Sequence, residues 1–183
     1  MLIKAIFAGF GGQGVLSMGL NLIQAAMMEG KYVTYLPSYG AEMRGGTANC
    51  TVAISDEEIA SPVASSPDFV VIMNQPSLIK FQNQVESGGI IFINSSLVEA
   101  NIPRGDIEII RVAANELAEK LGSPKSANMV MLGAVCKKSN LVSIATLEEG
   151  LKATLASKKS LLDINKKALM TGYELVQRSC NVH

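Results

Sequence analysis

A short apolar run at the start of the chain, residues 2–8, ends directly in a glycine-rich loop at residues 9–14. An apolar run of this length, bounded by glycine, is typical of a buried strand. Residues 15–29 follow with apolar side chains at helical spacing, and Gly30 is placed to end that helix. A strand, a glycine loop and a helix in this order open an α/β domain.

Further segments of both kinds follow along the chain. Apolar runs predict strands at 32–36, 47–55, 69–73, 90–93 and 107–112, and helical patterns predict helices at 76–87, 113–121, 127–138, 146–155 and 158–178. This alternation favours a three-layer α/β/α domain with a mostly parallel central sheet and a helical C-terminal third. The links are short and no repeat interrupts them, so residues 1–183 are expected to form a single domain.

The composition argues against several classes of protein. The 16 basic and 16 acidic residues cancel and tryptophan is absent, so neither a nucleic acid nor a membrane surface is expected as a partner. The apolar runs are too short to span a bilayer and the start of the chain lacks the pattern of a signal peptide, so a cytoplasmic location is expected. Three scattered cysteines and one C-terminal histidine predict no disulfide framework, metal site, iron–sulfur cluster or catalytic triad within this chain. No catalytic residue is predicted.

The loop carries glycines at positions 9, 11 and 14, which is the spacing of a dinucleotide fingerprint. Glycines let the backbone approach a diphosphate, and the following helix offers free N–H groups and the positive end of its dipole. A nicotinamide-binding domain also needs an acidic residue after its second strand, where residues 36–38 read Leu-Pro-Ser. The loop is therefore a candidate phosphate cradle, and glycines that only allow the helix to pack closely on the strand are the alternative.

A second segment, residues 38–50, reads SYGAEMRGGTANC and follows the second predicted strand. The segment is therefore expected at the edge of the sheet formed by the carboxyl ends of the strands, where open α/β sheets bind ligands. Arg44 has the geometry to bind a phosphate or carboxylate through two N–H groups, and two glycines after it permit close backbone approach. Thr47 and Asn49 offer further polar contacts. The alternative is a surface loop in which Arg44 and Glu42 form a solvated ion pair.

The two motifs, Gly-x-Gly-Gly-Gln-Gly-Val and Tyr-Gly-x-Glu-x-Arg-Gly-Gly, together resemble those of the gamma subunit, or fused gamma domain, of 2-oxoacid:ferredoxin oxidoreductases. The similarity continues through Ser61-Pro62, Pro67-Asp68, Asn74-Gln75-Pro76, Gly88-Gly89 and Ala127-Asn128-Met129. It covers most of residues 3–140. Ala41 stands where many relatives carry proline. The second motif favours the 2-oxoglutarate or branched-chain 2-oxoacid (ketoisovalerate) type over the pyruvate type.

The resemblance implies a subunit of an enzyme that oxidatively decarboxylates a 2-oxoacid to an acyl-CoA and reduces ferredoxin. In this family, alpha and beta subunits hold thiamine diphosphate, and iron–sulfur clusters belong to the beta subunit and a ferredoxin-like delta subunit. The gamma domain is expected to complete the complex and to help form the coenzyme A site, and the isolated chain is expected to be inactive. The residues expected to contact the phosphate-bearing part of coenzyme A are Gly11, Gly12, Gln13, Gly14, Arg44, Thr47 and Asn49.

Three other interpretations stay open at the level of sequence. The small subunit of indolepyruvate ferredoxin oxidoreductase shares the glycine loop. A stand-alone nucleotide-binding module would bind NAD(H) without partners, although the missing ribose-binding acid counts against it. A purely architectural subunit would use its glycine loop to pack against a neighbouring subunit.

Overall fold

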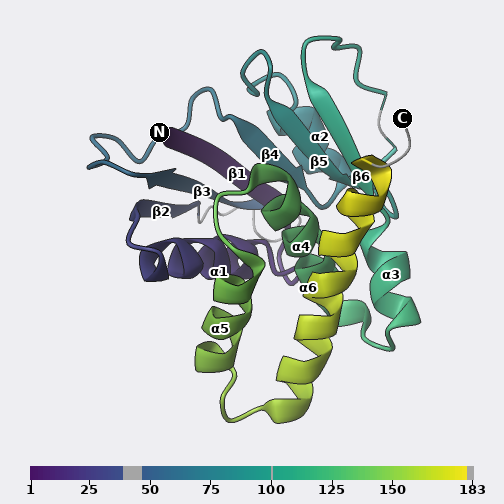
Figure 1. Ribbon diagram of the computed structural model, residues 1–183. Coiled ribbons are helices and arrows are strands. Elements are labelled where there is room, and N and C mark those ends of the chain that lie inside the picture. The colour runs from purple at the N-terminus through teal and green to yellow at the C-terminus, as the bar shows by residue number, and fades with distance from the viewer. Residues whose placement is uncertain (39–46, 100, 181–183) are drawn as a thin grey trace.

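A computed structural model describes residues 1–38, 47–99 and 101–180, and these contain one six-stranded sheet (Figure 1). The strands are β1 (Leu2–Phe10), β2 (Tyr32–Ser38), β3 (Thr47–Ser55), β4 (Phe69–Ile72), β5 (Ile90–Asn94) and β6 (Glu108–Val112). The helices are α1 (Val15–Met28), α2 (Gln75–Phe81), α3 (Ala114–Lys120), α4 (Ala127–Ser139), α5 (Ile144–Thr154) and α6 (Lys159–Cys180), with a 3₁₀ turn, η2 (Pro124–Ser126), directly before α4. In the described residues only helices follow β6, which confirms the predicted helical last third.

The strands lie in the order β2-β3-β1-β4-β5-β6. β1, β4, β5 and β6 pair in parallel, whereas β3 pairs antiparallel with both β1 and β2. The predicted mostly parallel sheet is confirmed, since β3 alone among these strands runs against the others. Its direction follows from the connection at residues 39–46, which is shorter than the crossover that parallel neighbours need.

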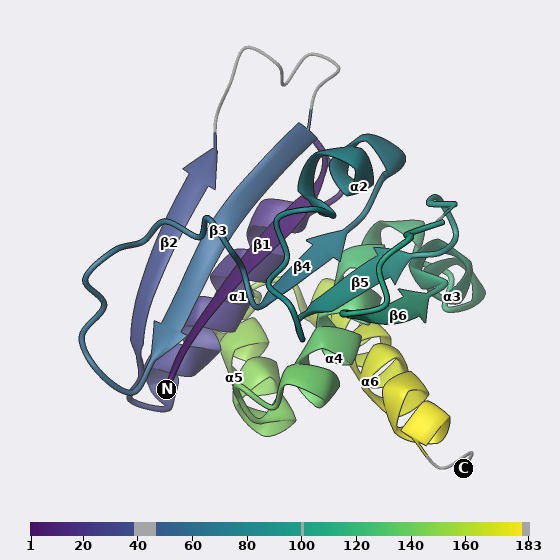
Figure 2. The same cartoon turned by 90° about the horizontal axis from the view of Figure 1, so that it is seen from above.

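Helices cover both faces of the sheet. In Figure 1, α1, α4, α5 and α6 lie beneath the sheet, and Figure 2 shows α2 against the opposite face. The predicted three-layer α/β/α arrangement is confirmed, with the two helical layers unequal in size. No helix in the described ranges is both long and apolar enough to cross a membrane.

The central strands are buried on both faces, which explains their continuous apolar sequences. On β1, Phe7 belongs to the core that contacts α1, whereas Ile6 belongs to the core that contacts α2. Phe7, Phe69 and Phe92 pack edge to face in the first core, with ring centroids 6.3 and 5.7 Å apart. This packing fixes β1 in the middle of the sheet and holds the glycine loop at its carboxyl end.

One predicted helix is shorter than its apolar pattern. α2 ends at Phe81 rather than near Ser87. Arg104 donates hydrogen bonds to the carbonyl oxygens of Gln82 and Val85, at 3.1 and 2.9 Å. The carbonyls that a longer helix would bond internally are therefore satisfied by a side chain from a distant loop.

Candidate functional site

The two sequence motifs meet at the carboxyl edge of β1. In the antiparallel register Gly9 pairs with Ala48 and Phe10 pairs with Thr47, so β3 begins where the glycine loop leaves β1. Ser38, the last residue of β2, pairs with Asn49 at the same edge. The segment between β2 and β3, which includes Arg44, lies outside the described residues, and for Thr47 only the backbone is described.

The side chain of Gln13 is used within the loop. Its Oε1 accepts a hydrogen bond from the Phe10 N–H at 2.6 Å, and its Nε2 donates to the Met73 carbonyl at 3.1 Å. The Gln13 N–H in turn donates to the Phe10 carbonyl at 3.2 Å. Gln13 therefore ties the loop to the end of β4, so in this structure its amide supports the loop.

Close packing or backbone conformation explains why two positions of the loop are glycine. A Cβ at Gly9 would lie 2.8 Å from the Met73 Cβ and 2.9 Å from a Val15 methyl, where no side chain fits. Gly14 has a φ of 74°, in the left-handed region, and a Cβ there would overlap the Asn128 side chain. Close packing explains these two positions without any ligand.

Gly11 and Gly12 differ from these two. A Cβ at either position would meet no atom of the described residues within 4 Å, although Gly12 has a φ of 91° that disfavours other residues. Gly11 has no steric neighbour among the described residues and no left-handed backbone. These residues therefore do not explain its lack of a side chain, which fits a position that a ligand approaches closely.

A cavity of about 360 Å³ opens beside Gly11, between the loop, the first turn of α1 and Ala48 of β3. The first hydrogen bond of α1 runs from the Met18 N–H to the Gly14 carbonyl at 3.0 Å. The backbone N–H groups that precede Met18 in the helix therefore have no partner within α1. The first turn has no side-chain cap and no acidic residue, so within the described part of the chain no side chain of α1 offsets the positive end of the helix dipole.

Asn49 lies on the other face of the sheet from this cavity. Its neighbours Ala48 and Cys50 belong to the core that contacts α1. Because side chains alternate along a strand, Asn49 points toward the opposite face, where it is 9% exposed. The structure therefore brings the backbone of Asn49 to the site edge and turns its side chain away from the first turn of α1.

Two polar side chains at this edge were not predicted from the sequence as site residues. Asn115 and Lys125 line a cavity of about 230 Å³ on the β4 side of the loop, together with Gly12 and Met73. Lys125 is carried by η2 and is exposed to solvent. No local pattern in the sequence marks it, because only the tertiary fold brings η2 next to the loop.

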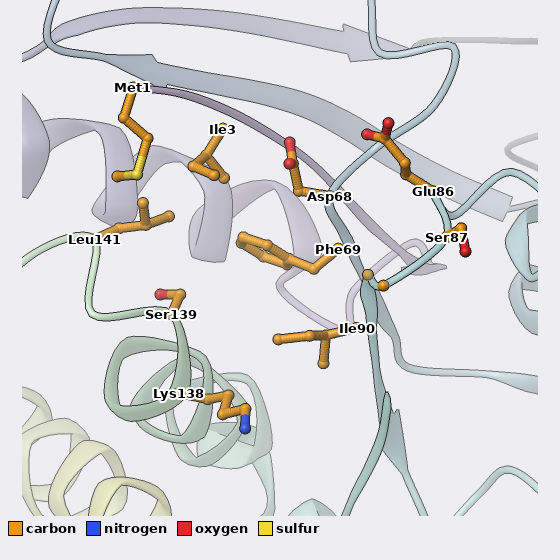
Figure 3. Close-up of a pocket in the computed structure, with 12 residues that line it drawn as sticks. Met1, Ile3, Asp68, Phe69, Glu86, Ser87, Ile90, Lys138, Ser139 and Leu141 are labelled. Carbon is orange, nitrogen blue, oxygen red and sulfur yellow. The ribbon is translucent and has the colours of Figure 1, made fainter. Parts of the chain in front are cut away.

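Another cavity, of about 380 Å³, lies at the opposite edge, where β4 and β5 begin. Figure 3 shows Phe69 and Ile90 between the Asp68 carboxylate and the Lys138 side chain. Asp68 accepts a hydrogen bond from a strand N–H at 2.7 Å, and Lys138 pairs with Glu108 at 2.8 Å. Both charges are thus engaged by the protein. Since open α/β sheets bind ligands at the carboxyl edge, the smaller cavities beside the glycine loop form the better candidate site.

The described cysteines offer no reactive thiol at this edge. Burial raises the pKa of both Cys50 and Cys136 to about 12, so both thiols stay protonated at neutral pH. Within the described ranges, no group of three or more histidine, cysteine or acidic side chains could hold a metal ion. The chemistry that remains at the site is the binding of a ligand by backbone N–H groups, glycine surfaces and Lys125.

Comparison with known proteins gives one matching family. The model for the pyruvate ferredoxin/flavodoxin oxidoreductase family matches residues 4–175. The chain is 43% identical over 174 residues to ketoisovalerate oxidoreductase subunit VorA of Methanothermobacter thermautotrophicus, covering 94% of this chain and 36% of VorA. It therefore spans about a third of that relative. It is 36% identical to 2-oxoglutarate synthase subunit KorC of Methanothermobacter marburgensis, covering 92% of this chain and 94% of KorC.

Solved structures share the fold. The gamma subunit of a keto/oxoacid ferredoxin oxidoreductase from Geobacter sulfurreducens superposes with a TM-score of 0.83 at 27% identity, covering 96% of this chain and 99% of that subunit. A chain of the 2-oxoglutarate:ferredoxin oxidoreductase from Magnetococcus marinus, solved with 2-oxoglutarate, coenzyme A and succinyl-CoA bound, gives a TM-score of 0.89 at 24% identity. The match covers 97% of this chain and 31% of that one, and it shows a common fold.

Proposed function

Because the chain belongs to the pyruvate ferredoxin/flavodoxin oxidoreductase family, we propose that it is the gamma subunit of an enzyme that converts a 2-oxoacid to an acyl-CoA and reduces ferredoxin. The resemblance to gamma subunits, predicted from two motifs, is confirmed by relatives and solved structures. The names VorA and KorC favour ketoisovalerate or 2-oxoglutarate as the substrate.

The proposed partners are alpha and beta subunits, a ferredoxin-like delta subunit, and ferredoxin as the electron acceptor. VorA supports a close association of this chain with a partner subunit, because the region of VorA that is similar to this chain is about a third of a longer polypeptide. In KorC the same region makes up nearly the whole subunit. We propose that thiamine diphosphate and the iron–sulfur clusters are held by the partner subunits.

The second part of the proposal is that the carboxyl edge of β1 binds coenzyme A. The observation that carries it is the pairing of Phe10 with Thr47, which joins the glycine loop to the segment containing Arg44. In this arrangement, phosphate groups lie against Gly11 and Gly12 and the free N–H groups of α1, with Arg44 supplying a positive charge.

The other predicted contact residues take supporting roles in this proposal. Gln13 and Gly14 shape the loop, Gln13 through its bonds to the loop and β4, and Gly14 through its left-handed backbone. Thr47 and Asn49 lie at the start of β3, which follows the Arg44 segment directly in the chain.

Gly11→Ala is the sharpest test, because the added methyl group meets no atom of the described residues within 4 Å. In the reconstituted complex we expect the KM for coenzyme A to rise roughly tenfold, a loss of about 1.4 kcal/mol of binding, while the melting temperature is unchanged. Arg44→Ala is expected to act in the same direction. Gly105→Ala is the matched control, because its methyl group also meets open space but lies away from this edge.

The competing outcomes are distinct. If Gly11→Ala and Arg44→Ala both leave the KM unchanged in assembled enzyme, coenzyme A does not bind at this edge. If Gly11→Ala instead weakens assembly in size-exclusion chromatography and the remaining complex keeps its KM, the loop packs on a partner subunit. That result would replace the coenzyme A assignment with an architectural role.

A further inference from the structure

We infer that Lys125 is an additional ligand-binding residue, which holds a phosphate group of the coenzyme A molecule bound at the glycine loop. This role of Lys125 rests on the proposed function of the loop. In the sheet, β1 lies between β3 and β4. The Arg44 segment leads into β3, whereas the cavity that Lys125 lines contains Met73, at the end of β4. Lys125 thus lies on the β4 flank of the loop, opposite the flank formed by β3.

Three neighbouring cavities surround the loop and the first turn of α1. Gly12 lines both the cavity of about 360 Å³ and that of about 230 Å³. Lys125 lines the latter and also a third cavity of about 220 Å³, which reaches between α1, α5 and α6. Ser17 of α1 lines the first and the third. The shared residues show that the three cavities adjoin one another, and we call them together the groove; Lys125 lines two of the three.

No acidic side chain of the described residues balances the charge of Lys125. Lys138 and Lys166 form ion pairs with acidic side chains, but Lys125 has no such partner among the described residues. No acidic side chain from the described ranges lines any of the three cavities, and Lys125 is the one charged side chain that does. A cation in a groove free of acids favours an anionic ligand.

The backbone of Lys125 is anchored on two sides. The Ser126 side chain, 1% exposed, donates a hydrogen bond from its Oγ to Asn165 of α6 at 3.1 Å. Asn128, at the start of α4, places its Nδ2 3.5 Å from the Gly14 carbonyl. The position of η2 relative to the glycine loop is therefore fixed before a ligand binds. Only the flexible Lys125 side chain has to be ordered, which keeps the entropic cost of binding low.

A neighbouring amide is also held toward the groove. The buried Asn94, 0% exposed, donates from its Nδ2 to the Asn115 Oδ1 at 2.7 Å. This bond occupies the acceptor of Asn115 and leaves its NH₂ group as a donor at the cavity that Lys125 lines. A donor amide and an ammonium group along the same wall suit phosphate oxygens, which accept hydrogen bonds.

Coenzyme A carries a 5′-diphosphate and a separate 3′-phosphate, so it offers anionic groups to a cation on either flank of the loop. The test uses the reconstituted complex with Lys125→Ala and Lys125→Gln. We expect the KM for coenzyme A to rise roughly tenfold with little change in kcat, as for a charged contact made equally in the ground and transition states. Lys125→Arg should keep most of the affinity. Lys167→Ala is the control, because it removes an exposed lysine of α6 that forms no ion pair with the described residues.

Dephospho-coenzyme A identifies the phosphate. If Lys125→Ala raises the KM for coenzyme A but not for the dephospho form, Lys125 contacts the 3′-phosphate; if it raises both, Lys125 contacts the diphosphate. Either result supports the inference. An unchanged KM for coenzyme A in Lys125→Ala and Lys125→Gln overturns it, and so does an equal rise in Lys167→Ala. When Gly11→Ala raises the KM and the Lys125 variants do not, the proposed function stands and only the role of Lys125 is wrong.

Discussion

The contact between α4 and α6 predicts an unusual response to a helix-stabilising substitution. Gly133 of α4 faces α6 so closely that an added Cβ would overlap the Leu169 carbonyl oxygen and lie 2.8 Å from the Tyr173 nitrogen. Non-bonded carbon atoms prefer separations of about 3.5 Å or more, so Gly133→Ala must push the two helices apart by roughly an ångström. The obstacle is backbone, which cannot move away by changing rotamer.

The expected change in the free energy of unfolding results from two opposing effects. Overpacking of a core costs up to about 3 kcal/mol, and separation of the helices also loosens contacts of Leu169 and Val130, both 0% exposed. Alanine in place of glycine within a helix contributes about 1 kcal/mol in the other direction. We therefore expect Gly133→Ala to lower the free energy of unfolding by about 2 kcal/mol.

Gly150 of α5 is the matched control. A Cβ there would lie 3.9 Å from atoms of Gln24 and Met28, which is ordinary van der Waals contact. Gly150→Ala should therefore show only the helix propensity and raise the free energy of unfolding by about 0.5–1 kcal/mol. The same chemical change in the interior of two helices is expected to have opposite signs.

Urea unfolding of the full chain, followed by circular dichroism, measures both values. For a chain of this size, a loss of about 2 kcal/mol lowers the melting temperature by roughly 4–8 °C. If Gly133→Ala is neutral or stabilising, the close approach of α4 and α6 is wrong. If Gly150→Ala is as destabilising as Gly133→Ala, the cost arises from something other than the helix contact.

Two further predictions concern titratable groups. The hydrogen bonds from Arg104, at 2.6 and 2.9 Å, hold the pKa of Asp106 at about 2, and Arg104→Ala should return it toward 3.8 in an NMR titration. Because the pKa of Asp106 is lowered in the folded state, the stabilisation from this pair is present above pH 3.8 and is lost as the pH falls toward 2. An unchanged Asp106 pKa in the Arg104→Ala variant would contradict the assigned role of Arg104. Burial raises the pKa of Cys50 and Cys136 to about 12, so thiol reagents at pH 8 should modify them only as fast as the protein unfolds. Peptide mapping by mass spectrometry measures both rates, and fast labelling of either native thiol would show that it is accessible.

The sequence predicted the strands well, because strands buried on both faces carry continuous apolar runs that are visible locally. It did not predict the antiparallel direction of β3, which depends on pairing between distant segments. The start of α5 was misplaced for a related reason. The N-cap is Ser143, whose Oγ accepts from the Thr146 N–H at 3.0 Å, and Glu29 accepts the Ser143 N–H at 2.7 Å. Glu29 lies at the end of α1, so a tertiary contact helps to fix this boundary.

The candidate site also has one part that the local sequence predicts and one part that depends on tertiary contacts. The glycine loop is a local pattern of closely spaced residues, and a sequence is enough to find it. Lys125 reaches the same edge through tertiary contacts, among them those of Ser126 with α6 and of Asn128 with Gly14. Its role depends on the arrangement of α4 and α6, whose close contact at Gly133 is tested by the stability measurements.

The fingerprint spacing alone does not separate glycines that bind a ligand from glycines that allow packing, but the space around each one does. Gly9 is surrounded by protein atoms, Gly14 has a left-handed backbone and a neighbour in Asn128, and Gly12 has the backbone reason only. Gly11 has neither reason. Nothing in the described residues requires glycine at this position, which agrees with the close approach of a ligand or a partner subunit there. Gly11→Ala is for that reason more diagnostic than Arg44→Ala, because it removes no charge and no contact within the described residues and adds only one methyl group.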